Sequence, residues 1–161
     1  MTKLLIVCTG NICRSPMAQV IAQKLAAEVS LLVPLIVDSA GTHTAQVAER
    51  VDPRARAALV RHGYEAGHRR SRQVSVQDCR NFDWILAMDS RNLADLQRLC
   101  PQEHLHKLRL FLSFAPELGE TMMPDPYYGN VQGFDNVILL CQAGARGLLM
   151  HLRSTRHPDK T

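Results

Sequence analysis

The sequence predicts an α/β fold, a single-domain doubly wound sheet of about four parallel strands with helices on both faces. Short apolar runs alternate with longer amphipathic stretches, which is typical of parallel strands joined by right-handed helical crossovers. A length of 161 residues suits one domain, and 46% hydrophobic with 21% charged residues is the composition of a globular protein. We therefore expect one domain over residues 3–154 and a flexible tail over residues 155–161.

The first strand is predicted at residues 4–7, an unbroken apolar run. A polar loop from Cys8 to Arg14 follows it directly. Pro16 suits the first position of a helix, because its ring fixes φ and its missing N–H is not needed there. Apolar residues then recur at helical spacing on one face of this helix: Met17, Ala18, Ile21, Ala22, Leu25 and Ala26.

Further strands and helices are expected to alternate along the rest of the chain. The helix after Asp52 has the clearest limits, because Asp caps a helix, Pro53 fits its first position and Gly63 suits its end. Residues 113–133 are rich in Pro and Gly and too long for a plain connector, so they are expected to be functional. The expected strands are residues 35–37, 84–88 and 108–111, and the expected helices are about residues 53–62, 90–99 and 134–152.

The loop from Cys8 to Arg14 is a candidate phosphate cradle at the switch point of the sheet, where ligands bind in such folds. Free backbone N–H groups and the helix dipole favour an anion at a helix N-terminus. Together with Arg14 they would stabilise a thiolate on Cys8, the nucleophilic form of cysteine. The planar fork of Arg14 can hold two oxygens of a phosphoryl group. Thiolate attack on phosphorus is the predicted chemistry.

The spacing of Cys and Arg alone is weak evidence, because it arises often by chance and also fits a buried Cys beside a surface Arg. The context strengthens it, since a strand precedes the loop and a helix follows it. Asn11 tolerates the left-handed backbone that a tight loop requires. The hydroxyl of Ser15 can either reach back to Cys8 or cap the helix.

Residues 7–18, VCTGNICRSPMA, resemble the signature of the low-molecular-weight protein tyrosine phosphatases. The resemblance runs from Lys3 to about Leu152. It implies hydrolysis of phosphotyrosine, and of small aryl phosphates, through a phosphocysteine intermediate on Cys8. Later segments resemble the family in order and spacing: Asp38-Ser39-Ala40-Gly41-Thr42, Asp52-Pro53-Arg54-Ala55, Ser71-Arg72-Gln73, Ala87-Met88-Asp89 and Asp125-Pro126-Tyr127-Tyr128-Gly129.

The resemblance also implies roles for single residues. Arg14 would bind phosphate, and Asp125 would be the general acid and base, although its position also suits an ordinary Asp-Pro turn. Tyr127 and Tyr128 would stand at the pocket mouth, where their rings can contact a phenyl ring. The other expected phosphate-binding residues are Thr9, Gly10, Asn11, Ile12, Cys13 and Ser15, with Ser39 holding Asn11 from behind.

Three positions leave questions open. The resemblance favours a reversible bridge between Cys8 and Cys13, while a small loop filler is the alternative for Cys13. Arg69 stands where the family usually has His, and His68 lies one position earlier, so the contact that this His makes with Asn11 is in doubt. Ala45 stands where relatives often carry an aromatic residue in the cleft wall.

Two other classes of enzyme or carrier fit the sequence less well. An arsenate reductase of the same fold would need two closely spaced Cys after the third strand, but none follows until Cys100. A phosphocarrier would need neither Arg14 nor Asp125. A dinucleotide site is disfavoured because Gly10 stands alone, without the G-x-G-x-x-G pattern.

Composition limits the remaining possibilities. The net charge is +4, but the basic residues are scattered, and the one cluster, Arg69-Arg70 with Arg72, is explained better by a solvated surface than by nucleic-acid binding. No stretch resembles a membrane span or a secretion signal, so a cytoplasmic location is expected. The five Cys lack paired C-x-x-C spacing and indicate neither a disulfide framework nor a zinc site.

No metal or cofactor is therefore expected. The expected partner is a phosphotyrosine-containing protein, with a bacterial-type tyrosine kinase as a candidate source of that substrate. Phosphate or other oxyanions are expected inhibitors, because they would occupy the same cradle.

Overall fold

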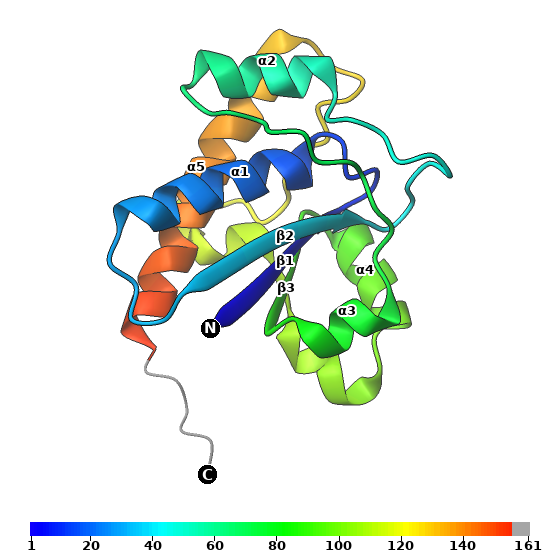
Figure 1. Ribbon diagram of the computed structural model, residues 1–161, viewed down its shortest axis with the longest axis vertical. Helices are drawn as coiled ribbons and strands as arrows, with labels where there is room; N and C mark the ends of the chain where they lie inside the picture. Colours follow the sequence, from blue (N-terminus) through cyan, green and yellow to red (C-terminus); the bar gives the residue numbers. More distant parts are fainter. Residues whose placement is uncertain (156–161) are drawn as a thin grey trace.

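The computed structural model describes residues 1–155 as one parallel sheet with helices on both faces (Figure 1). The order of the strands across the sheet is β2-β1-β3-β4, which confirms the predicted fold class. The strands are β1 (Thr2–Cys8), β2 (Leu35–Gly41), β3 (Trp84–Ala87) and β4 (Leu108–Leu110). The α-helices are α1 (Arg14–Glu28), α2 (Pro53–Arg61), α3 (Val76–Asn81), α4 (Ser90–Leu99) and α5 (Val131–Ser154), and short 3-10 helices are η1 (Gln102–Lys107), η2 (Phe111–Phe114) and η3 (Pro116–Leu118).

The central strand β1 is buried on both faces, which explains its continuous apolar sequence. Leu4 and Ile6 belong to the core that α1, α2 and α5 cover, whereas Leu5 and Val7 belong to a second core that α3 and α4 cover. Figure 1 shows these two groups of helices on opposite sides of the sheet. The alternation follows from the two-residue period of a strand.

The chain leaves β1 where the strand order reverses, because β1 has β2 on one side and β3 on the other. Cys8 pairs with Gly41 of β2, and Val7 pairs with Ala87 of β3. The carboxyl ends of three strands therefore meet around Cys8. This is the place where open parallel sheets bind ligands.

The capping residues mark where the helices begin more closely than the spacing of apolar residues does. α2 begins at Pro53 as predicted, with Asp52 as its cap. α1 already begins at Arg14, so Pro16 lies within its first turn, where the missing N–H costs nothing. α5 begins at Val131 and not at the expected residue 134, because the side chain of Asn130 caps it. The short helix α3, which begins after a capping box at Ser75, was not predicted.

Cys79 and Cys100 form a disulfide, so the expectation of no disulfide was wrong. Their Cα atoms are 5.7 Å apart, as a disulfide requires. Cys79 lies on α3 and Cys100 directly after α4, and the packing of both helices on the same face of the sheet brings them together. Sequence spacing carries no sign of such a contact. Cys8, Cys13 and Cys141 are free thiols.

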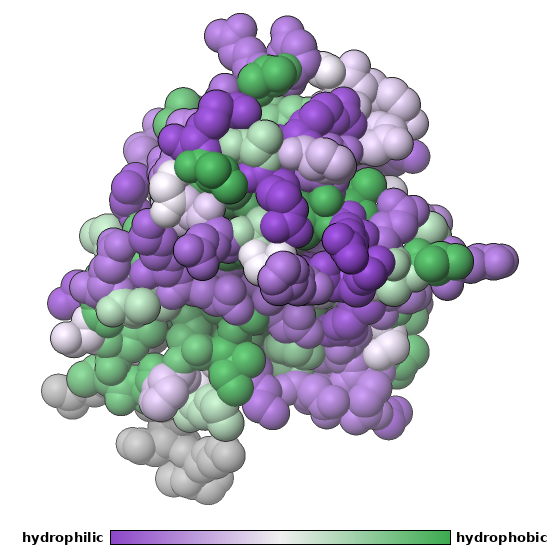
Figure 2. Space-filling model, turned by 45° about the horizontal axis from the view of Figure 1, so that its top comes forward, coloured by the Kyte–Doolittle hydropathy of each residue, from purple (hydrophilic) through white to green (hydrophobic). Residues whose placement is uncertain are grey.

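Most of the face drawn in Figure 2 is hydrophilic, and its apolar side chains gather mainly toward the lower left. Of the helices within residues 1–155, none has the length and apolar character needed to cross a membrane. The expected tail over residues 155–161 lies, apart from Thr155, outside the described residues. The limits of the domain, residues 3–154, stay a prediction.

The close approach of α5 to η2 depends on glycine. A Cβ atom on Gly147 would lie 1.8 Å from the carbonyl oxygen of Phe114, which cannot rotate away. We expect Gly147→Ala to lower the free energy of unfolding by about 1 to 3 kcal/mol. Gly133→Ala on the same helix is the control, because the nearest atom to its Cβ is 3.8 Å away. Urea denaturation measures both, and equal stability of the two variants would contradict the packing described.

Candidate active site

Residues 9–13 form the loop that joins β1 to α1. Asn11 has φ of 55°, the one positive value at a non-glycine position within residues 1–155. Asn adopts this left-handed conformation more readily than most residues do. The backbone N–H of Asn11 donates to Sγ of Cys8 at 3.3 Å. The loop therefore turns back on Cys8, as the sequence predicts.

Cys8 lies at the carboxyl end of β1, directly before this loop, and its side chain is buried. Its Sγ atom lies 2.9 Å from Oγ of Ser15. Ser15 makes this contact and does not cap α1, which has no side-chain cap. The free N–H groups and the dipole of α1 favour a negative charge here, on either a thiolate or a phosphate.

Arg14 is held in a fixed orientation at the start of α1. Its Nη1 atom donates to Oδ2 of Asp89 at 2.6 Å and to the carbonyl oxygen of Met123 at 3.1 Å, and 3% of its side chain is exposed. Burial opposes its charge, but the hydrogen bond to Asp89 and the nearby Cys8 and Asp125 raise the pKa of Arg14 above its ordinary value. The guanidinium is a charged, oriented fork, which suits two phosphate oxygens.

Asp125 lies across the pocket from the phosphate loop. Its Oδ2 atom is 3.5 Å from Nη2 of Arg14, and its Oδ1 atom accepts the N–H of Tyr127 at 3.1 Å. Its side chain is 47% exposed, so it has access to solvent. The rings of Tyr127 and Tyr128 meet edge to face, with centroids 4.9 Å apart. The Asp-Pro turn and the position near the loop are thus both present.

The start of α2 links the phosphate loop to the segment that carries Asp125. The N–H of Asp52 donates to the carbonyl oxygen of Ile12 at 2.9 Å. Nη1 of Arg54 donates to the carbonyl oxygen of Tyr127 at 2.9 Å, and its guanidinium carbon lies 5.2 Å from the centroid of the Tyr127 ring. Nη2 of Arg54 also donates to Oδ2 of Asp52 at 2.9 Å. The hydrogen bonds from Arg54 lower the pKa of Asp52, so the carboxylate and the guanidinium form an ion pair at neutral pH.

An open pocket of about 470 Å³ lies between these segments. Three of the predicted site residues lie behind the loop and do not line the pocket: Asn11, Ser15 and Ser39. Ala45 lines a separate shallow hollow beside Thr44 and Gln73. The predicted site residues that line the pocket are Cys8, Thr9, Gly10, Ile12, Cys13, Arg14, Asp125, Tyr127 and Tyr128, and the lining residues that were not predicted are His43, Arg91 and Asp95.

Asp89 and Asn92 are site residues that the sequence did not reveal. Asp89 belongs to the segment Ala87-Met88-Asp89 that resembles the family, and it stands directly before the expected helix over residues 90–99, where Asp can act as a cap. Its Oδ1 atom does accept the N–H of Asn92 at 2.8 Å. Its other oxygen binds Arg14. Nδ2 of Asn92 donates to Oγ1 of Thr9 at 3.0 Å. The first turn of α4 therefore supports the phosphate loop, and only the cap carried a signal in the sequence.

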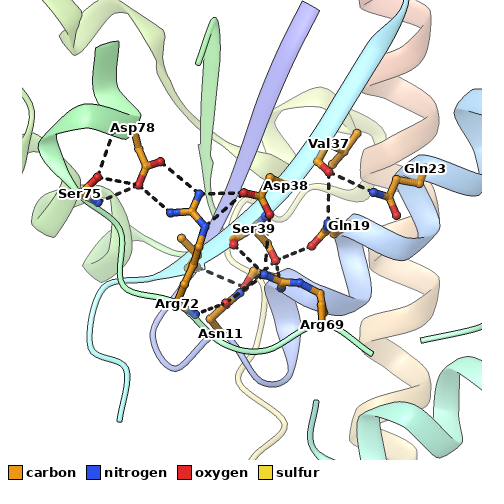
Figure 3. Close-up of polar contacts among 12 residues, drawn as sticks. Asn11, Gln19, Gln23, Val37, Asp38, Ser39, Arg69, Arg72, Ser75 and Asp78 are labelled. Carbon is orange, nitrogen blue, oxygen red and sulfur yellow. Dashed lines mark hydrogen bonds and ion pairs between the residues drawn. The ribbon is translucent and has the colours of Figure 1, made fainter. Parts of the chain in front are cut away.

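A polar network behind the loop joins it to β2 (Figure 3). Nδ2 of Asn11 donates to Oγ of Ser39 at 3.0 Å, so the predicted contact between these two residues is present. Arg69 donates to Oγ of Ser39 and, from Nη2, to Oδ1 of Asn11 at 3.4 Å. The backbone N–H of Arg72 donates to the same Oδ1 atom at 3.0 Å. Arg69 thus takes the place in which the resemblance led us to expect His.

Cys13 is a buried free thiol that lines the pocket. Burial, first of all, and the nearby Asp52 and Cys8 raise the pKa of this thiol. The reversible bridge between Cys8 and Cys13 stays a prediction. Within residues 1–155, no group of three or more His, Cys, Asp or Glu is arranged to hold a metal ion.

Several known proteins are similar to this chain over most of their length. A family model for low molecular weight phosphotyrosine protein phosphatase matches residues 3–157. The low molecular weight protein-tyrosine-phosphatase of Streptomyces coelicolor is 39% identical over 150 residues, which are 91% of this chain and 91% of that protein. A low molecular weight phosphotyrosine phosphatase from Vibrio cholerae O395 has a crystal structure that is 39% identical and gives a TM-score of 0.89, with 96% of this chain and 98% of that chain covered. The tyrosine phosphatase Wzb from Escherichia coli K30, solved with sulphate, is 27% identical with a TM-score of 0.80, over 93% and 97% of the two chains.

Proposed function

The chain belongs to the low molecular weight phosphotyrosine protein phosphatase family, and from this premise we propose how its own residues hydrolyse phosphotyrosine in proteins. The observation that carries the proposal is the convergence of Cys8, Arg14 and Asp125 on one pocket. A nucleophile, an oriented cation and a proton donor are the groups that transfer of a phosphoryl group to a thiolate requires.

In the first step, the thiolate of Cys8 attacks phosphorus and the bond between phosphorus and the tyrosine oxygen breaks. The loop N–H groups and Arg14 hold the other phosphoryl oxygens. Asp125, as the acid, gives its proton to the departing phenolate. The products of this step are a tyrosine hydroxyl and a phosphocysteine on Cys8.

In the second step, water attacks the phosphocysteine. The carboxylate of Asp125 takes a proton from this water, so the same side chain acts first as acid and then as base. The bond between sulfur and phosphorus breaks, and inorganic phosphate leaves. Ser15, 2.9 Å from Cys8 Sγ, can donate its hydroxyl hydrogen to the thiolate that is released.

The walls of the pocket suit an aryl phosphate. Tyr127 and Tyr128 can contact the phenyl ring of the substrate, and Ile12 adds an apolar side chain from the loop. Ala45, where relatives often carry an aromatic residue, does not line this pocket, whereas His43 and Arg91 do. Among the residues that line the pocket, the two tyrosines therefore supply the aromatic rings for a phenyl group, beside the imidazole of His43.

We extend the proposal to partners and location. Phosphate and other oxyanions would inhibit by occupying the cradle, which the sulphate complex of Wzb supports. A bacterial-type tyrosine kinase as the source of the substrate, and a cytoplasmic location, belong to this proposal. Reduction of arsenate is not favoured, because no pair of closely spaced Cys follows β3 and Cys100, the first Cys after it, does not line the pocket.

Release of phosphate from a phosphotyrosine peptide and of p-nitrophenol from p-nitrophenyl phosphate tests the function. Both reactions should proceed with a metal chelator present and without any added thiol relay protein. A matched phosphoserine peptide is the control, because its shorter side chain does not bring phosphorus between the tyrosines and down to Cys8. If the protein hydrolyses neither of these aryl phosphates, the proposed function is wrong.

A further inference from the structure

Behind the phosphate loop, Arg69 donates hydrogen bonds both to the side chain of Asn11 and to Ser39, which accepts from Asn11 (Figure 3). We propose that Arg69 is a positioning residue for Cys8, because its fixed donors orient the Asn11 amide and thereby leave the hydroxyl hydrogen of Ser15 free for the thiolate. The inference deepens the proposed function and assigns a residue that never touches the substrate.

The first step of the argument is the orientation of the Asn11 amide. Its Oδ1 atom accepts from the backbone N–H of Arg72 at 3.0 Å and from Nη2 of Arg69 at 3.4 Å. Neither an amide N–H nor a guanidinium can accept a hydrogen bond. A flipped amide would bring its NH₂ group against two donors, so one orientation is allowed.

The second step follows the two hydrogens of this amide. Nδ2 of Asn11 donates to Oγ of Ser15 at 2.8 Å and to Oγ of Ser39 at 3.0 Å. Both hydrogens are used, and both serine oxygens act as acceptors. Ser39 also accepts from Arg69, and its own hydrogen goes to Oε1 of Gln19 at 2.7 Å.

The third step concerns the hydrogen of Ser15. Since Oγ of Ser15 accepts from Asn11, its own hydrogen must be donated elsewhere. Sγ of Cys8 lies at 2.9 Å, whereas the alternative, the carbonyl oxygen of Ala40, lies at 3.4 Å. The hydrogen therefore points to sulfur, where it stabilises a thiolate both before attack and when sulfur is the leaving group.

The positive charge of Arg69 also favours the thiolate form of Cys8. Its side chain is 19% exposed, and its Nη2 atom lies 3.8 Å from Oδ1 of Asp38. The pKa of Arg69 is lowered overall, mainly by burial and also by Arg72, although Asp38 and Cys8 act to raise it. A guanidinium stays charged at neutral pH even so. His at this position would change its donors with protonation near neutral pH, but Arg keeps them.

Other charged and titratable groups surround the two ends of this chain of hydrogen bonds and are unchanged in the variants below. Arg72 binds both Asp38 and Asp78, which fixes the segment that carries Arg69. Asp89 binds Arg14, and Cys141 on α5 lies near Cys8 on the buried side. The charged and titratable groups that line the pocket together with Cys8 are Cys13, Arg14, His43, Arg91, Asp95 and Asp125.

The test measures the alkylation of Cys8 by iodoacetamide as a function of pH, which needs no substrate. Arg69→Met should move the midpoint of this profile upward by about one pH unit, and should lower kcat/KM about tenfold to a hundredfold. Fragment masses distinguish Cys8 from Cys13. Arg69→Lys should recover part of both losses. Arg70→Met is the matched control, because Arg70 is the exposed neighbour and should change neither quantity.

Arg69→His gives a second readout. The ratio of wild-type to variant kcat/KM should increase as the pH rises through about 6.5, where His loses its charge. A midpoint and kcat/KM equal to those of the wild type in Arg69→Met, with only the urea midpoint lowered, would show that Arg69 merely stabilises the fold. If Arg69→Met does not fold, a flat ratio in Arg69→His would overturn the proposal. If the alkylation midpoint shifts in Arg69→Met as expected but the wild type has no phosphatase activity, the proposed function is wrong while the role of Arg69 stands.

Discussion

Cys8→Ser should lower kcat for p-nitrophenyl phosphate by roughly four to six orders of magnitude while the fold stays intact. A serine hydroxyl is almost completely protonated at neutral pH, so the nucleophile is lost. The loop N–H groups and Arg14 remain, and Arg14 keeps its contacts with Asp89 and Met123. The variant should therefore still bind phosphate or vanadate, which calorimetry measures.

The matched control is Cys141→Ala, because Cys141 is also a buried free thiol but does not line the pocket. It should keep most of the activity. Mass spectrometry of acid-quenched wild-type enzyme should show phosphate on Cys8. Phosphate on a histidine, or substantial turnover by Cys8→Ser, would exclude Cys8 as the nucleophile.

Asp125→Asn should slow the hydrolysis of phosphotyrosine by about 10² to 10⁴-fold. The amide keeps the size of the side chain and can still accept the N–H of Tyr127, but it has no proton to give to the phenolate. The loss should be much smaller for aryl phosphates whose phenols are acidic, because these leave without protonation. Steady-state kinetics across a series of leaving groups measures this dependence.

Glu120→Gln is the control for Asp125, since Glu120 is an exposed carboxylate in the same long segment and outside the pocket. It should change no rate in the series. A loss in Asp125→Asn that is equal for all leaving groups would mean that Asp125 only shapes the turn before Tyr127.

The phosphate loop and the fold class could be predicted because their signals are local. A strand buried on both faces is apolar throughout, and the loop and the helix start follow it within a few residues. The resemblance then led to Asp125, which lies far along the chain from Cys8. For Asp125 and the two tyrosines the structure supplies the position, while their roles stay predictions.

The partners of Arg14 and Asn11 could not be predicted, because they depend on how distant segments pack. Asp89 lies 75 positions from Arg14, and a capping Asp has the same sequence signal whether or not it also binds a guanidinium. Arg69 looked like part of a solvated basic cluster, although its donors point inward to Ser39 and Asn11. Such contacts arise from strand order and crossover geometry.

The two halves of the reaction rest on parts of the protein with different local stability. Cys8 ends a strand that has hydrogen-bonded neighbours on both sides, so we expect the amides of this strand to be among the last to exchange with solvent. Asp125 lies in a segment without helix or strand, between Met123, which is bonded to Met88, and Asn130, which caps α5. We therefore expect the amides of this segment to exchange with solvent before those of β1, which hydrogen exchange measures.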